Sequence, residues 1–187
     1  MKRFFDFVLS LTALIIIFLP LTIIYLLVLI TSSRPVIYWS KRVGKNNKLF
    51  MMPKFRTMKK HTPELPTDKL IKPEQWWTPL GKILRKTSLD ELPQLINIIK
   101  MDMSLIGPRP IVVDEVNKYG DDISKVFSIR PGISGLWQVS GRNKLTYKRR
   151  VEIDVIYADN YCLLMDLRII LRTIGVIFFP KDNDEYY

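Results

Sequence analysis

The sequence contains a single cysteine, Cys162, and a single histidine, His61, among 187 residues. One cysteine excludes a disulfide scaffold and a multi-cysteine zinc site. The histidine is followed by Thr-Pro in an expected loop, which disfavours catalysis by an imidazole. Acidic residues are scarce too, because 18 Asp and Glu face 29 Lys and Arg, and the net charge of +11 indicates anionic partners: phosphates, nucleic acid or anionic lipid. A hydrophobic fraction of 48% excludes an intrinsically disordered chain, and the length suits one modest domain.

Charge is absent from residues 7–30, a run of 24 residues. A straight helix of this length would extend ~36 Å at about 1.5 Å per residue, enough to cross a hydrocarbon core of ~30 Å. A cleaved signal peptide fits less well, because the run is longer than the usual apolar region and residues 31–34 offer no clear small-residue cleavage site. The run therefore predicts a membrane segment.

Pro20 lies in the middle of this run and predicts a kink, because it has no N–H for the carbonyl of Ile16. The halves on either side reach only about 20 and 15 Å, so neither crosses a membrane alone. Basic residues flank both ends, whereas a simple span concentrates them on the cytoplasmic side. The residues alone leave a kinked span and a re-entrant hairpin open. The flanking residues are Lys2, Arg3, Arg34, Lys41 and Arg42.

The rest of the chain predicts an α+β fold that is mostly helical, with a few short strands. The segment 59–79 carries four prolines and is expected to form a loop. The other expected elements are a hairpin over 36–58, helices over 80–101 and 111–127, a glycine-rich segment over 130–143, and helices over 146–159 and 163–179.

The last expected helix is amphipathic. Its apolar stripe faces either a membrane surface or the core of the domain, and the residues leave both interpretations open. The stripe consists of Leu163, Leu164, Leu167, Ile170, Leu171, Ile174 and Phe178, with Asp166, Arg168 and Arg172 opposite.

Two adjacent carboxylates, Asp90 and Glu91, are the first candidates for chemistry. Ser88 and Glu91 match a capping box, and Pro93 is tolerated only near a first turn, so the pair is expected at a helix N-terminus. That position keeps an aspartate ionised and favours an incoming phosphate, two requirements of a carboxylate nucleophile that attacks phosphorus. The alternative is that the two carboxylates only cap the helix.

Several basic residues lie where proline or glycine restrains the backbone. Arg109 stands between two prolines, and Arg130 and Arg142 flank a glycine-rich loop. Guanidinium and backbone N–H groups in such segments suit a diphosphate, although a Walker A motif is absent. The alternative is a tight turn packed on Trp137. The candidate phosphate-binding residues are Lys54, Arg56, Arg85, Arg109, Arg130 and Arg142.

Asp154 and Tyr157 form a third candidate, since they are three residues apart and share a helix face. They are suited to steady a metal, a ribose or one of the arginines. A divalent ion is chemically expected if two phosphates sit beside a carboxylate nucleophile, because Mg²⁺ takes oxygen ligands and offsets phosphate charge.

The sequence resembles the bacterial sugar transferases known as monotopic polyprenyl-phosphate phosphoglycosyl transferases, in their minimal catalytic form. The resemblance covers almost the whole chain and rests on long motifs in the right order. They are KRFFDF before a proline-broken apolar segment, KFRTM at 54–58, SLDELPQLINIIKMDMSLIGPRP at 88–110, RPGISGLWQVSGRN at 130–143 and EIDVIYADNYCLLMDLRII at 152–170.

The resemblance implies an enzyme that transfers a phosphosugar from a nucleotide diphosphate sugar, expected to be a UDP-sugar, to a polyprenyl phosphate, expected to be undecaprenyl phosphate. Asp90 would attack the sugar-bearing phosphate and release UMP, and the lipid phosphate would then take the phosphosugar from the carboxylate. Glu91 would aid proton removal or metal placement, and Mg²⁺ would be held by Asp90. The basic residues above would bind substrate phosphates or shape the site, supported by Asp154. The reaction would be the first membrane step of bacterial glycoconjugate biosynthesis.

The resemblance also implies a re-entrant membrane helix over residues 1–33 and a catalytic domain over 34–187 on the cytoplasmic face of the bacterial inner membrane. Membrane lipid is then a partner and nucleic acid is not, while a homo-oligomer is left open. Two positions depart from the family pattern: Leu19 precedes the proline where serine is frequent, and Tyr161-Cys162 stands where an aromatic residue and serine are expected. Two other functions are considered, a membrane-anchored basic binding module without chemistry and a scaffold for other enzymes.

Overall fold

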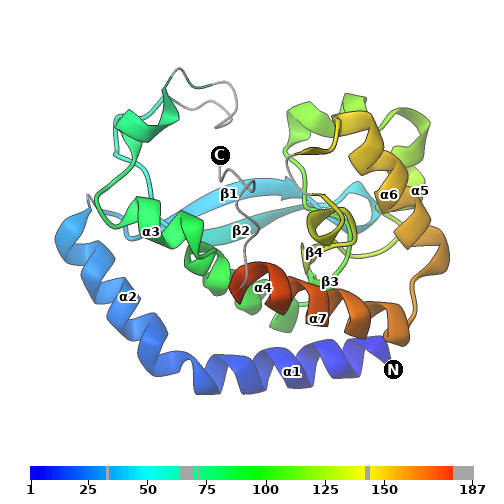
Figure 1. Cartoon of the computed structure of the whole chain (residues 1–187), viewed down its shortest axis with the longest axis horizontal. Helices are drawn as coiled ribbons and strands as arrows, with labels where there is room; N and C mark the ends of the chain where they lie inside the picture. Colours follow the sequence, from blue (N-terminus) through cyan, green and yellow to red (C-terminus); the bar gives the residue numbers. More distant parts are fainter. Residues whose placement is uncertain (33, 64–69, 71, 142–143, 179–187) are drawn as a thin grey trace.

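The computed structural model describes residues 1–32, 34–63, 70, 72–141 and 144–178. Two N-terminal helices, α1 (Lys2–Ile16) and α2 (Phe18–Thr31), run along one edge of the molecule in different directions (Figure 1). Within the described chain, their combined length is the one helical stretch long and apolar enough to cross a membrane. The helix breaks at Ile17, next to Ile16, whose carbonyl receives no hydrogen bond from Pro20 because proline has no N–H.

The predicted hairpin is confirmed. Strand β1 (Ile37–Val43) pairs antiparallel with β2 (Leu49–Phe55), and the short helix η1 (Lys45–Asn47) forms the turn. Because Tyr38 pairs with Lys54, the strand alternation places Lys54 and Arg42 on the same face of the hairpin.

The continuous helix predicted over 80–101 is wrong. The chain forms three short helices there, and Ser88 between the first two has a left-handed backbone with φ of 57°. The segment 111–127 is likewise broken into short turns of helix. These elements are α3 (Gly81–Lys86), η4 (Leu89–Gln94), α4 (Leu95–Ile99), η5 (Val113–Lys118), η6 (Gly120–Asp122) and α5 (Ile123–Val126), and η3 (Pro73–Trp76) precedes them.

The glycine-rich segment contributes β4 (Gly132–Ser134), which pairs in parallel with β3 (Ser104–Ile106). The two backbones meet so closely that a Cβ on Gly132 would lie 2.1 Å from the backbone nitrogen of Gly107. Glycine is therefore required at this crossing. The helix η7 (Trp137–Val139) follows the pair.

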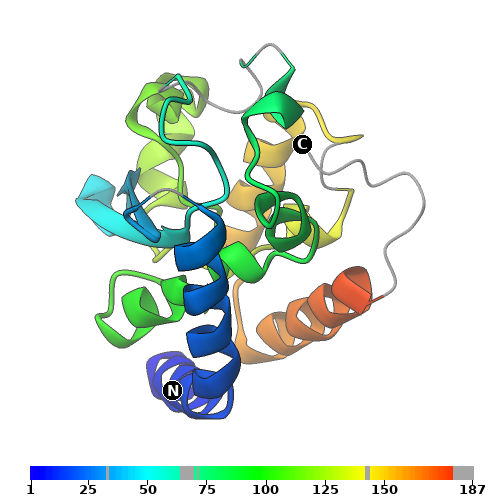
Figure 2. The ribbon, with the colours of Figure 1, turned by 90° about the vertical axis from the view of Figure 1, so that its left-hand side faces the viewer.

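The two late helices are confirmed as α6 (Tyr147–Asn160) and α7 (Leu163–Phe178). Figure 2 shows α7 extending from the body on the side away from the hairpin. Ile169 on α7 is buried, but most of the predicted apolar stripe is exposed, with Leu171 at 69%. For these exposed leucines, the interpretation in which the stripe faces the core is wrong.

Buried apolar side chains of the described residues form four clusters that join successive elements. One of them brings Met52 of β2 against Leu95 and Ile98 of α4, with Ile17 of the N-terminal segment packed on it. A second brings Val28 of α2 against the base of the hairpin. The N-terminal helices are thus part of the packed structure, and the boundary at residue 33 stays a prediction.

The N-terminal helix α1 also carries a polar face that docks on β3. The buried carboxylate of Asp6 accepts hydrogen bonds from the hydroxyl of Ser104 at 2.7 Å and from the next backbone N–H at 3.3 Å. Lys2 donates to the carbonyl of Ile106 at 3.1 Å and to the carboxylate of Asp166 on α7. The start of α1 is therefore tied to both β3 and α7.

Candidate active site

An ion pair links the hairpin to the helix that carries both candidate carboxylates. Nζ of Lys54 on β2 donates to Oε1 of Glu91 on η4 at 2.5 Å, and both side chains are largely buried. This pair fixes where η4 lies relative to the strands. Lys54 and Glu91, which the sequence analysis singled out separately, are thus brought into direct contact.

The capping box predicted from Ser88 and Glu91 is wrong. Ser88 is left-handed and its side chain makes no capping hydrogen bond to η4. The carboxylate of Glu91 turns to Lys54 instead of back to the helix end. For Glu91, a salt bridge to Lys54, 37 residues away in the sequence, is favoured over a local capping hydrogen bond. Pro93 is tolerated inside η4 because η4 is a short 3₁₀ helix.

Asp90 is buried, with 7% of its surface exposed. Burial and the neighbouring charge of Glu91 raise the pKa of Asp90 to about 6, although Lys54 and Arg85 oppose the shift. Among the described residues Asp90 forms no salt bridge. Its carboxylate is therefore mostly ionised at neutral pH and is not ion-paired with any described Lys or Arg.

Arg85 supports this carboxylate from α3. Its Nε donates to Oγ1 of Thr57 at 3.1 Å, which fixes the direction of the guanidinium. Burial lowers the pKa of Arg85, while the charges of Asp90 and Glu91 raise it in part. Arg85, a candidate phosphate-binding residue from the sequence, thus lies near enough to Asp90 for their charges to interact.

Glu91 has the opposite electrostatics to its neighbour. Burial acts to raise the pKa of Glu91, but Lys54, Arg109 and Arg42 together lower it to about 2. The two adjacent carboxylates thus differ because their surroundings differ. Three cations keep Glu91 ionised, whereas Asp90 binds its proton more tightly than a free aspartate.

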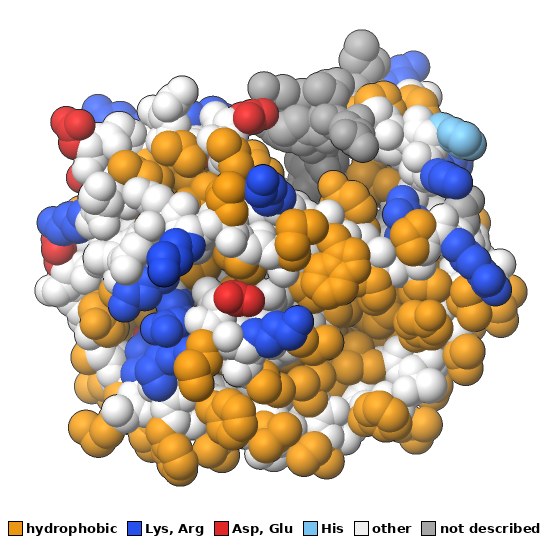
Figure 3. Space-filling view, turned by 180° about the vertical axis from the view of Figure 1, so that it is seen from behind, with side chains coloured by type: hydrophobic (Ala, Val, Ile, Leu, Met, Phe, Trp, Pro, Cys, Tyr) orange, Lys and Arg blue, Asp and Glu red, His pale blue; other side chains and the backbone are white. Residues whose placement is uncertain are grey.

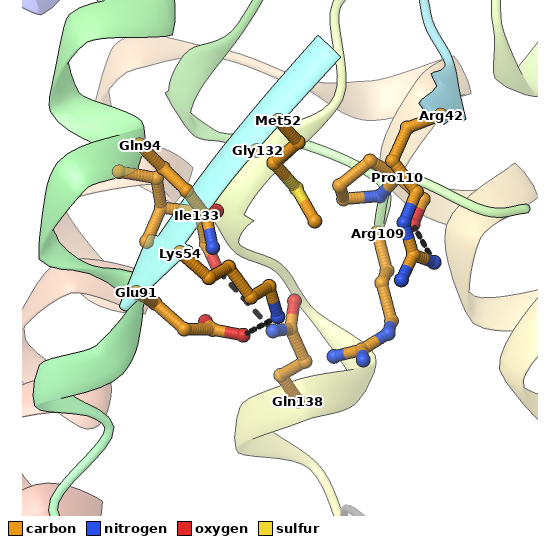
Figure 4. A pocket seen from close by; sticks show the side chains of 10 residues that line it. All are labelled: Arg42, Met52, Lys54, Glu91, Gln94, Arg109, Pro110, Gly132, Ile133 and Gln138. Carbon is orange, nitrogen blue, oxygen red and sulfur yellow. Dashed lines mark hydrogen bonds and ion pairs between the residues drawn. The ribbon is translucent and has the colours of Figure 1, made fainter. Parts of the chain in front are cut away.

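A narrow cleft opens beside the dyad, and Figure 4 shows the side chains around it. Lys54, Arg109 and Gln138 extend toward the same space, with Arg42 across from Glu91. The cleft is lined by Arg42, Met52, Lys54, Glu91, Gln94, Arg109, Pro110, Gly132, Ile133 and Gln138. Three cations against one carboxylate make it a site for an anion.

Three of these polar residues were missed by the sequence analysis as site residues. Arg42 was counted only as a membrane flank, although the strand alternation that places it on the same face of the hairpin as Lys54 was a usable signal. It is held by the carbonyl of Pro110 at 3.3 Å and by Ser40 at 3.0 Å. Gln94 and Gln138 carried no signal, and Nε2 of the first and Oε1 of the second are buried without a hydrogen-bond partner among described residues. These atoms are available to a ligand.

Arg109 stacks over the ring of Trp137, with its guanidinium carbon 5.9 Å from the ring centre. Trp137 is buried, and Arg150 of α6 also lies over it at 4.8 Å. The glycine-rich segment therefore contains the buried Trp137 and also lines the cleft through Gly132. The two interpretations of this segment, a turn packed on Trp137 and a loop at an anion site, are thus compatible.

Of the six predicted phosphate-binding residues, only Lys54 and Arg109 are among the described residues that line this cleft, and Arg85 near Asp90 is not. Arg56 donates to the carbonyl of Pro35 at 2.7 Å and lies over the ring of Tyr38. Arg130 donates to the carbonyl of Met101 at 2.6 Å and lines a different pocket. Arg142 lies outside the described residues.

Asp154 is fully buried on α6, and its Oδ2 accepts a hydrogen bond from the hydroxyl of Tyr119 at 3.1 Å. Burial raises the pKa of Asp154 to about 8, against the effects of Tyr119 and Arg109. Its helix neighbour Tyr157 donates instead to Asp166 at 2.6 Å. The expectation that Asp154 and Tyr157 act together is therefore wrong, since they belong to separate networks.

The described residues contain no group of three His, Cys, Asp or Glu side chains suited to hold a metal ion. Asp90, which forms no salt bridge with a described residue, is adjacent in the chain to Glu91 of this cleft. One such carboxylate together with substrate phosphates is a donor set that Mg²⁺ accepts.

Comparison with known proteins identifies the family. The sequence matches the family described as bacterial sugar transferase over residues 1–180. The chain belongs to this family. An undecaprenyl-phosphate galactose phosphotransferase of Salmonella typhimurium is 43% identical over 95% of this chain. The exopolysaccharide production protein ExoY of Sinorhizobium fredii is 38% identical over 97%, and a UDP-glucose:undecaprenyl-phosphate glucose-1-phosphate transferase of Klebsiella pneumoniae is 36% identical over 96%.

The lengths of these family members differ. The chain spans 40% of the Salmonella protein and 40% of the Klebsiella protein, but 87% of ExoY. The similarity thus covers at least 95% of this chain in each case, and two of the relatives contain additional sequence.

Asp154 gives this family member a stability that depends on pH. Its folded pKa of about 8 lies above the unfolded value of ~3.9, so the folded state retains a proton that the unfolded state loses. Stability from this group should be greatest below about pH 4, fall by at most about 1.4 kcal/mol per pH unit up to about pH 8, and level off above it. Melting temperatures of detergent-solubilised protein across this range measure the slope.

Asp154→Asn should flatten that slope, because the amide is neutral at every pH. The matched control is Asp114→Asn, which changes an exposed carboxylate on η5. Equal slopes in wild type and Asp154→Asn would show that Asp154 does not hold the extra proton.

Proposed function

We propose that this protein transfers a phosphosugar from a UDP-sugar to undecaprenyl phosphate, giving undecaprenyl diphosphate sugar and UMP. The observation that carries the proposal is Asp90, a buried carboxylate without a salt bridge among described residues, adjacent in the chain to the carboxylate that lines a cation-rich cleft. The names of the Salmonella and Klebsiella relatives, an undecaprenyl-phosphate galactose phosphotransferase and a UDP-glucose:undecaprenyl-phosphate glucose-1-phosphate transferase, support the same reaction class.

The first step is attack by a carboxylate oxygen of Asp90 on the phosphorus that bears the sugar. The bond to the bridging oxygen of the diphosphate breaks, UMP leaves with that oxygen, and a phosphosugar remains on Asp90. In the second step a phosphate oxygen of the lipid attacks the same phosphorus, and the aspartyl–phosphorus bond breaks. Both steps are displacements at phosphorus in which the enzyme supplies the nucleophile and then the leaving group.

The cations of the cleft stabilise the phosphate oxygens during both displacements. Arg109 and Arg42 present guanidinium groups, which match phosphate geometry, while Lys54 is already paired with Glu91. Glu91, with a pKa of about 2, is poorly suited to remove a proton at neutral pH. We assign it instead to holding Lys54 and to raising the proton affinity of Asp90.

Mg²⁺ is part of the proposal, with Asp90 as its protein ligand and substrate phosphates as the others. When bound, the ion would offset phosphate charge and polarise the phosphorus that is attacked.

The membrane arrangement is also proposed. Both ends of the apolar segment contact the same domain: Lys2 bonds to β3 and α7, and Val28 packs against Phe55 and Leu84. Two ends held on one domain favour a re-entrant segment over a span that would separate them by ~30 Å. The residues around the break, among them Ile16 and Phe18, are strongly exposed and would enter the lipid deepest. We place the domain on the cytoplasmic face of the bacterial inner membrane, with the exposed stripe of α7 on the lipid surface.

The reaction is tested by UMP release from a panel of UDP-sugars, with detergent-solubilised enzyme, Mg²⁺ and undecaprenyl phosphate. Asp90→Asn should reduce release by roughly 10³-fold or more, because it removes the nucleophile. Intact mass of the wild type with donor alone should show a phosphosugar adduct that Asp90→Asn lacks. The control Asp121→Asn changes an exposed carboxylate on η6 and should retain full activity. A phosphosugar adduct on Asp90→Asn would exclude Asp90 as the nucleophile.

The role given to Glu91 predicts a change in pH dependence. Glu91→Gln removes a like charge beside Asp90 and therefore lowers the pKa of Asp90 below about 6. The acid limb of the kcat/KM profile should move to lower pH, even if the maximum rate falls. Glu91→Asp, which keeps the charge, should leave the limb near its original position. An acid limb that does not move in Glu91→Gln argues against electrostatic coupling between the two carboxylates.

The re-entrant arrangement predicts that both flanks of the apolar segment lie on the cytoplasmic side. Cys162 is exposed, so it is first replaced by serine. A cysteine-bearing tag before Met1 and a separate Asn46→Cys variant should then resist an impermeant maleimide in spheroplasts and react after lysis. Labelling of the tag from outside, with Asn46→Cys protected, would indicate a span instead.

A further inference from the structure

A second pocket lies beside the turn of the hairpin and shares no lining residue with the cleft at the dyad. Its volume is about 420 Å³. The lining includes Lys45, Lys48 and Phe50 from the hairpin, Met101 and Asp102 from the loop after α4, and Arg130. The proposed transfer reaction uses none of these residues.

Two arginines are fixed to the loop that forms one wall of this pocket. Arg130 donates through Nε to the carbonyl of Met101 at 2.6 Å, and Arg3 of α1 donates through Nη1 to the carbonyl of Met103 at 3.2 Å. The two guanidinium groups are near enough to repel each other electrostatically. Backbone carbonyls therefore hold two like charges together, and the terminal nitrogens of Arg130 remain for another acceptor.

The charges around the pocket are not balanced. Arg3, Arg130, Lys45 and Lys48 form no salt bridge with a described carboxylate. The one acidic residue in the lining is Asp102, whose carboxylate accepts a hydrogen bond from Asn97 at 3.4 Å. Three cations of the lining, Lys45, Lys48 and Arg130, face this one carboxylate, and a bound anion would stabilise them.

The pocket lies at the border between basic and apolar surface. Arg3 is followed on α1 by Phe4, which is 70% exposed, and by Phe5, which is also exposed. Figure 3 shows basic side chains gathered just above the hydrophobic lower edge of the molecule, at the end where α1 begins. An anion that binds here has an apolar surface directly beside it.

We propose that this second pocket binds a phosphate anion, and that the anion is the headgroup phosphate of an anionic membrane phospholipid whose acyl chains lie along α1. Arginine is suited to paired hydrogen bonds with phosphate oxygens, and basic pockets at the cytoplasmic membrane surface recognise anionic headgroups. The lipid source rests on the membrane arrangement proposed above. Arg130 thereby binds a lipid that holds the enzyme at the surface, and not the phosphates of the reacting sugar nucleotide.

The test compares protein in phosphatidylcholine nanodiscs with protein in nanodiscs that also contain phosphatidylglycerol. Wild type should retain phosphatidylglycerol in native mass spectra, and the double variant Arg130→Gln/Lys48→Gln should bind it about 30-fold more weakly. Lys48→Gln alone should show a smaller loss and guards against misfolding, because Lys48 is exposed. The control Lys144→Gln/Lys148→Gln removes the same charge from exposed positions before and on α6 and should change binding less than about threefold.

Inorganic phosphate and glycerol phosphate, added to the detergent-solubilised protein, separate the two sources of the anion. One outcome is that phosphate stabilises the wild type against heat but not the double variant, while the wild type shows no preference for phosphatidylglycerol. That outcome would support the anion site and assign it a soluble ligand. Equal lipid binding and equal phosphate stabilisation in wild type, double variant and control would overturn the proposal.

Binding is measured in the Asp90→Asn background, so it does not depend on turnover. If the double variant releases UMP normally and binds lipid as tightly as the wild type, the proposed reaction stands and only the proposal of a second site is refuted.

Discussion

The ion pair between Lys54 and Glu91 is the interaction on which the geometry of the site depends. It joins the hairpin to η4 and so determines where Asp90 stands relative to the cleft. It also keeps Glu91 charged, and that charge contributes to the raised pKa of Asp90. Because Lys54 is paired with Glu91, the proposed phosphate contacts are assigned to Arg42 and Arg109. One salt bridge thus bears on both the position and the proton affinity of the proposed nucleophile.

The parts of the fold that the sequence predicted are those whose pattern is local and regular. The hairpin, α6 and α7 follow from alternation or helical periodicity over whole elements. The prediction failed at 80–101, because the spacing of the leucines is compatible with a helix whether or not the chain is broken at Ser88. A left-handed serine has no signature in hydrophobic periodicity. The capping box failed for a related reason: its pattern is local, whereas the partner of Glu91 comes from β2.

The same limit applies to the site. Lys54, Glu91 and Arg109, which line the cleft, were candidates from the sequence and its family resemblance, as was Asp90 next to Glu91. Proline and glycine indicated correctly that the backbone is fixed around Arg109 and Arg130, but a fixed backbone does not say which way a side chain points. Arg130 turns to the carbonyl of Met101, and Arg56 to that of Pro35. Arg42 became a cleft residue only through strand register, and Gln94 and Gln138 only through tertiary packing.

The polar face of α1 has a consequence for the order in which the chain assembles. Lys2, Arg3 and Asp6 are made first, yet their partners at residues 103–106 follow about a hundred positions later, and Asp166 later still. The apolar helix is therefore synthesised long before the partners of Lys2, Arg3 and Asp6 exist. Contacts with so large a sequence separation form slowly and late. The contacts that tie α1 to β3 and α7 are therefore expected to form late in folding, after almost the whole chain has been made.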